Sequence, residues 1–94
     1  MARVRASDLE PAAAVLTSLR SLDALTERGL GRFTVGSASF LHFHALASGL
    51  VADVKVGDAW RRYELADAAG RRTLIRDVPR VLAGERTGLG GRPT

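Results

Sequence analysis

The chain has 94 residues, of which 46% are hydrophobic and 26% charged, a balance that indicates one folded domain and excludes wholesale disorder. It contains no cysteine, which excludes disulfide bonds and thiolate metal sites. No run approaches the roughly 18 apolar residues of a membrane span, and no apolar segment follows the basic start. We therefore expect a cytoplasmic protein with neither a membrane span nor a secretory signal.

The net charge is +4, and Lys55 is the only basic residue that is not an arginine. The arginines are spread along the chain, and no nucleic-acid-binding motif accompanies them. Non-specific phosphate binding through these dispersed arginines is therefore the least favoured of the functions considered below.

The first helix is predicted to follow an extended, flexible lead over residues 1–6. Ser7 and Glu10 fit the S-x-x-E capping box, and Pro11 is tolerated only near a first turn. Apolar residues then recur at three- and four-residue spacing as far as Leu19. The pattern loses phase around residues 21–23, which leaves open a break or a second short helix, and glycines at 29 and 31 are expected to end the helical region.

After residue 31 the period changes to two, which predicts strands. A meander of three or four antiparallel strands follows from the runs at 32–35, 38–45, 50–56 and 59–65. Turns are expected at Gly36-Ser37, at residues 47–49 and at Gly57-Asp58, and the last is a strong signal for a tight hairpin.

A second helix is predicted from Asp67, whose side chain can cap it. Its apolar face comprises Leu74, Ile75, Val78, Val81 and Leu82. Pro79 falls within this face and predicts a kink or a restart near Val78. Residues 85–94 are expected to form a flexible tail.

The sequence thus predicts a single α+β domain over residues 1–94. In it, a three- to four-stranded antiparallel meander is packed on one face by an N-terminal and a C-terminal helix. Strand alternation places Leu41, Phe43 and Val54 on the face that carries the helices.

The opposite face is predicted to carry a polar row. A two-residue turn at Gly57-Asp58 pairs Asp53 with Arg62 and Lys55 with Trp60. Keeping Leu41 and Phe43 on the helix side then places either His42 or His44 opposite Asp53.

Apolar side chains are predicted on the same polar face. Phe40, Val51 and Trp60 share it, and so do Phe33 and Val35 if Gly36-Ser37 is a two-residue turn. We expect such a mixed face to be covered by a second copy of the chain, by a ligand or by the chain's own termini.

Three motifs in residues 40–65 resemble the small luciferase-like domain family of unknown function. They are Phe40-Leu41-His42-Phe43-His44, the strand that starts at Gly49-Leu50 and carries Asp53, and Ala59-Trp60-Arg61-Arg62-Tyr63. Members of that family have a His-containing strand, a Gly-Leu-x-x-Asp strand, a Gly-Trp or equivalent, and a closing helix. The resemblance centres on His44, Asp53 and Trp60 and implies a compact α+β fold.

Three functions are consistent with these patterns. The preferred one is a non-catalytic domain whose face of His42, His44, Asp53, Trp60 and Arg62 binds a small ligand or mediates homodimerisation. The second is a site built on His42, His44 and Asp53, which either hold a divalent metal or perform acid–base catalysis. The third is the nucleic-acid binding described above.

Overall fold

The structure is a computed structural model that describes the backbone of residues 4–87 and the side chains as far as residue 84. Its centre is an antiparallel sheet of five strands in the order β1-β2-β3-β4-β5, one strand more than predicted. The strands are β1 (Thr26–Gly29), β2 (Arg32–Val35), β3 (Ala38–Leu46), β4 (Gly49–Val56) and β5 (Ala59–Glu64). The helices are α1 (Ala6–Leu9), the 3₁₀ turn η1 (Glu10–Ala12), α2 (Ala13–Arg20) and α3 (Ala68–Thr87). The prediction of an α+β fold is confirmed.

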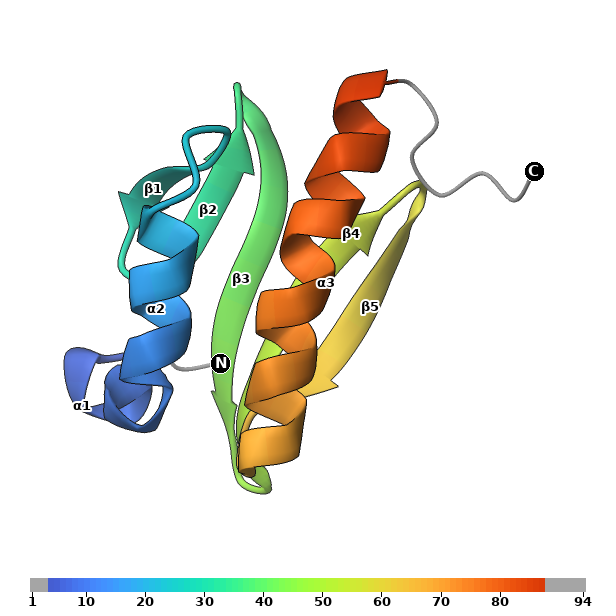
Figure 1. The fold of residues 1–94 in the computed structure, drawn as a ribbon. Coiled ribbons are helices and arrows are strands. Elements are labelled where there is room, and N and C mark those ends of the chain that lie inside the picture. Colours follow the sequence, from blue (N-terminus) through green and yellow to red (C-terminus); the bar gives the residue numbers. More distant parts are fainter. Residues whose placement is uncertain (1–3, 88–94) are drawn as a thin grey trace.

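Helices α2 and α3 lie side by side on one face of the sheet (Figure 1). The core between the two layers contains buried side chains from both helices and from the strands, among them Leu19, Leu41 and Leu74. Within the described residues, no helix combines the length and the apolar character that crossing a membrane requires.

The N-terminal helix begins earlier and ends sooner than predicted. The N-cap is Arg5, whose backbone N–H donates to Asp8 Oδ2 at 2.9 Å, so the predicted Ser7–Glu10 capping box is wrong. Helix α2 stops at Arg20, and residues 26–29 form strand β1 instead of extending the helical region to Gly29. Gly31 has a φ of +73°, which makes the tight turn from β1 to β2 favourable.

The register of the three central strands is as predicted. His42 pairs with Asp53 and Asp53 with Arg62, while Lys55 pairs with Trp60. The sheet face turned away from α2 and α3, called the open face below, therefore carries the predicted polar row.

A β-bulge between β2 and β3 changes the predicted position of three apolar residues. Phe33 pairs with Leu41 but Thr34 pairs with Ser39, which leaves Phe40 as the extra residue. Phe33 and Phe40 are only 1% and 3% exposed and belong to the helix-side core, and Val35 packs against that core. Their predicted place on the open face is wrong, because the bulge turns them inward and burying each phenyl ring stabilises the fold by about 1.5–3 kcal/mol.

Helix α3 begins where the sequence predicts. Asp67 Oδ1 accepts a hydrogen bond from the Gly70 N–H at 2.9 Å and so caps the helix. The helix runs unbroken through Pro79, so no restart occurs near Val78.

Residues 85–87 continue helix α3, whereas the rest of the predicted tail lies outside the described residues. At the N-terminus, residues 1–3 lie outside the described residues. The predicted flexible lead is wrong for Val4, which packs against the core, and for Ala6, which begins α1.

Replacing Gly70 by Ala is expected to destabilise the fold. In an ordinary helix this change stabilises by about 1 kcal/mol, but here the added Cβ would lie 1.7 Å from the backbone oxygen of Glu64. We expect a loss of about 1–3 kcal/mol, measured by urea unfolding. Gly36→Ala is the control, because its Cβ meets nothing within 4 Å and only its φ of +60° opposes the change. A Gly70→Ala variant as stable as wild type would contradict the close packing of α3 on β5.

Candidate functional site

All five residues predicted for the site are brought together on the open face. His42 and His44 come from β3, Asp53 from β4, and Trp60 and Arg62 from β5. Strand alternation places them there, because their neighbours in sequence, such as Leu41 and Val54, are buried under the helices.

Asp53 and Arg62 form the strongest polar contact of the face. Arg62 donates from Nε to Asp53 Oδ1 at 2.9 Å and from Nη2 to Asp53 Oδ2 at 3.0 Å, so the contact is bidentate. The hydrogen bonds from Arg62 hold the pKa of Asp53 below its ordinary value, and the neighbouring imidazoles contribute. His44 Nε2 lies 3.4 Å from Asp53 Oδ2. Asp53 is therefore an ionised side chain whose two oxygens both accept hydrogen bonds from Arg62.

His42, Trp60 and Lys55 form an aromatic and cationic group. The rings of His42 and Trp60 lie 4.9 Å apart between centroids at an interplanar angle of 40°. The two residues belong to β3 and β5, about 10 Å apart, so their rings lean toward each other above β4. Lys55 Nζ lies 5.3 Å from the Trp60 ring centroid, within cation–π range. Trp60 remains 43% exposed and offers the largest accessible ring of the face.

The imidazole of His42 is neutral at physiological pH. Burial lowers its pKa, and the nearby His44 and Arg32 lower it further, while Asp53 opposes them. The His42 ring is thus a neutral hydrogen-bonding group beside the guanidinium of Arg32.

A metal site gains no support from this geometry. Within the described part of the chain, no group of three or more His, Cys, Asp or Glu side chains is placed to hold a metal ion. His42 and His44 have ring centroids 5.9 Å apart, and both oxygens of Asp53 face Arg62. The metal hypothesis for His42, His44 and Asp53 stays a prediction from sequence only.

A pocket of about 400 Å³ lies on the open face next to the aromatic group. It is lined by Arg28, Arg32, Phe33, Thr34, Ser37, Ser39 and His42. Of these, sequence reasoning identified only His42 as a site residue. Arg28 and Ser39 could not be placed from the pattern, because β1 and the bulge at Phe40 bring them to this face.

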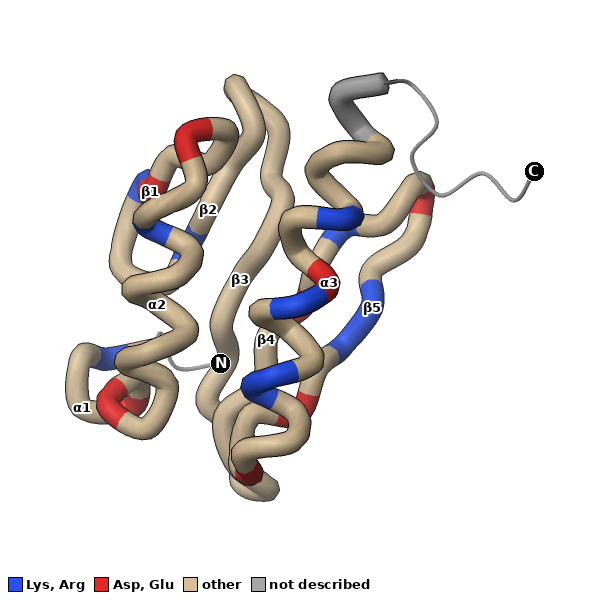
Figure 2. The backbone as a smooth tube through the Cα atoms, viewed as in Figure 1, with Lys and Arg blue, Asp and Glu red and all other residues tan. Residues whose placement is uncertain are grey.

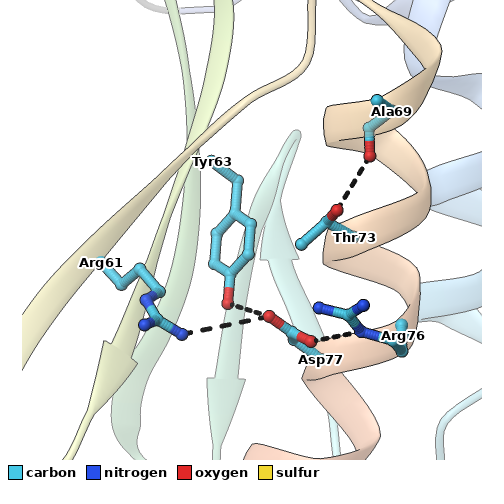
Figure 3. A network of polar contacts seen from close by, with 6 residues as sticks. All are labelled: Arg61, Tyr63, Ala69, Thr73, Arg76 and Asp77. Carbon is cyan, nitrogen blue, oxygen red and sulfur yellow. Dashed lines mark hydrogen bonds and ion pairs between the residues drawn. The ribbon is translucent and has the colours of Figure 1, made fainter.

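A second polar cluster joins β5 to α3 on the helix side (Figure 3). Tyr63 donates from its hydroxyl to Asp77 Oδ2 at 2.9 Å, and Arg76 Nε donates to Asp77 Oδ1 at 2.9 Å. Arg61 Nη1 lies 4.0 Å from Asp77 Oδ2. Burial raises the pKa of Tyr63, so its hydroxyl stays a donor at neutral pH. Burial alone would raise the pKa of Asp77 too, but hydrogen bonds from Arg76 and Tyr63 bring it below its ordinary value.

Comparison with protein-family models, with curated proteins and with solved structures finds no match for this chain. Function therefore has to be inferred from the geometry of the open face.

Replacing Asp53 by Asn tests the pair with Arg62 through its pH dependence. Because the folded-state pKa of Asp53 is lowered, the carboxylate stabilises the fold above its unfolded pKa of about 3.9. That contribution is lost as the pH falls through the folded pKa. At pH 7 we expect the variant to be less stable by about 0.2–1 kcal/mol, the range of partly exposed pairs. In urea unfolding the difference should shrink as the pH is lowered below the unfolded pKa of about 3.9.

Asp58→Asn is the matched control, because Asp58 lies in the exposed turn after β4 and forms no ion pair among the described residues. Its stability should follow that of wild type throughout this pH range. An Asp53→Asn variant that equals wild type at pH 7 would show that the pair does not contribute.

Replacing Tyr63 by Phe should weaken the attachment of α3 to β5. Removal of the hydroxyl deprives Asp77 of one of its two hydrogen bonds, and we expect a loss of about 1 kcal/mol in the free energy of unfolding. A double-mutant cycle with Asp77→Asn isolates the contribution of the pair. A coupling energy of zero in that cycle would contradict a stabilising contact.

Proposed function

We propose that this protein is a small non-catalytic binding domain whose open face binds a small anionic ligand. One observation carries the proposal, namely the excess of positive charge on a face that none of the described helices covers. Arg28, Arg32, Lys55 and Arg62 lie there, and the acidic side chains opposed to them are Asp53 and Glu64.

The positive charge of the open face, and not the net charge of the whole chain, supports an anionic ligand. Lys and Arg positions occur on β5 and along α3 as well as on the inner strands, so the net charge identifies no particular surface (Figure 2). On the open face, by contrast, Asp53 is engaged by Arg62, whereas Arg28, Arg32 and Lys55 form no ion pair among the described residues. Uncompensated cations on one surface attract anions.

The contacts of Asp53 support a binding role over acid–base catalysis. A general base needs a histidine oriented by a carboxylate. His44 Nε2 lies 3.4 Å from Asp53 Oδ2, but that oxygen accepts a shorter hydrogen bond, of 3.0 Å, from Arg62. His42 contacts Trp60 and His44 through its ring instead of donating to an acid. Membership of the small luciferase-like domain family, suggested by the strand motifs, is part of this proposal.

A second copy of the chain is the alternative partner for the open face, since Trp60 is exposed and tryptophan is enriched at interfaces. Two copies of the same face would, however, bring their excess positive charges together, which opposes face-to-face pairing. The charge of the face favours an anion.

Titration with pyrophosphate tests the proposal. We expect amide NMR shifts in β2, β3 and β4, and an affinity that falls as the salt concentration rises, because salt screens exposed charges. In Lys55→Glu, which makes the face neutral overall, binding should weaken roughly fivefold. Arg72→Glu is the matched control, since it changes the net charge equally but at an exposed position on α3, and it should leave binding unchanged.

Three outcomes would overturn an anion-binding open face. The first is the absence of shifts on these strands, and the second is an equal loss in both variants. The third is a dimer in native mass spectrometry that Trp60→Glu converts to a monomer, because the face would then be an interface between copies.

A further inference from the structure

The pocket beside the aromatic group is lined by two arginines, Arg28 and Arg32. Arg28 donates from Nε to Thr34 Oγ1 at 3.2 Å and from Nη2 to the Gly36 oxygen at 3.3 Å. These two contacts fix the guanidinium against the β2–β3 turn and leave its other N–H groups for a ligand. Because neither contact is to a carboxylate, the charge of Arg28 is not neutralised.

Arg32 supplies the second cation of the pocket. It forms no ion pair among the described residues, and its charge lowers the pKa of the neighbouring His42. Ser39 lies across from Thr34 on the next strand, and its hydroxyl makes no hydrogen bond within the described part of the chain. The Thr34 hydroxyl donates to the Gly36 oxygen at 2.9 Å and is not a donor for a ligand. Two guanidinium groups with the Ser39 hydroxyl beside them match the oxygens of a phosphate group.

His42 lies between this pocket and the aromatic group. It lines the pocket on one side and contacts the Trp60 ring on the other, with centroids 4.9 Å apart. Arg32 and Trp60 come from β2 and β5, so a ligand that reaches both needs an anionic end, a spacer and a planar end. The exposed part of Trp60 can stack with a planar ring, and Lys55 beside it adds a further positive charge.

We infer that the open face binds a mononucleotide, with its phosphate between Arg28 and Arg32 and its base against Trp60. This inference rests on the proposed anion-binding function and names the class of ligand. The pocket volume of about 400 Å³ lies within the range of small-ligand sites, and the sugar is the spacer that passes His42.

Calorimetric titration with adenosine 5′-monophosphate, ribose 5-phosphate and adenosine tests the inference. The monophosphate should bind at least fivefold more tightly than ribose 5-phosphate, which lacks the base, and more tightly than adenosine, which lacks the phosphate. The fluorescence of Trp60, the only tryptophan, should change with the monophosphate and stay constant with ribose 5-phosphate.

Two variants separate the two ends of the site. Arg32→Gln should weaken binding of the monophosphate and of ribose 5-phosphate about tenfold. Arg72→Gln on α3 is its control and should leave both unchanged. Trp60→Leu should bring the affinity for the monophosphate down to that for ribose 5-phosphate. Arg28→Gln provides a second test of the phosphate end if Arg32→Gln does not fold.

The outcomes distinguish this inference from the proposed function. If ribose 5-phosphate and pyrophosphate bind as tightly as the monophosphate, the nucleotide inference is wrong while anion binding stands. If none of these anions binds, both are wrong. An eight-residue oligodeoxyadenylate that binds more than tenfold more tightly than the monophosphate would overturn a mononucleotide ligand in favour of single-stranded nucleic acid.

Discussion

The pairing of β3 with β4 and of β4 with β5 decides which side chains meet water and which meet the helices. A shift by one residue would expose Leu41, Phe43 and Val54, each of which stabilises the fold by about 1.5–3 kcal/mol when buried. The same shift would place Asp53 and the other polar side chains of the open face under the helices, where burying a charge is costly. The composition of the open face is therefore a consequence of how the core forms.

One apolar side chain of the open face is buried although none of the described helices covers this face. Val51 lies on this face between His44 and Glu64, yet it is only 1% exposed and is not part of the helix-side core. Because Val51 does not belong to the helix-side core, other side chains of the open face must shield it from water.

The part of this arrangement that depends on local chemistry could be predicted from the sequence. Period-two alternation and the Gly57-Asp58 turn were sufficient to align Asp53 with Arg62 and Lys55 with Trp60. The cap at Asp67 was likewise predictable from the residue type and its position before an apolar stripe. Each of these features is decided by residues close together in the chain.

Strand β1 and the bulge at Phe40 are decided by distant contacts, and the sequence did not reveal them. Thr26–Gly29 has no apolar alternation, and it becomes a strand by pairing with β2. Phe40 follows the alternation of β3, but burial of its ring favours a local break in register. The pocket with Arg28 and Ser39 depends on both features, so a site beyond the predicted row could not be found without the structure.

Arg62 determines which chemistry the open face can perform. Without this guanidinium, Asp53 would be a partly buried carboxylate beside two imidazoles. Such an arrangement is suited to orienting a base or holding a metal. With it, the carboxylate accepts two charged hydrogen bonds and its negative charge is largely balanced. The arginines at 28 and 32 then remain without an acidic partner in the described residues, and His42 between them and Trp60 stays neutral. A face that balances its central acid but not its flanking cations is suited to holding an anion and not to moving a proton.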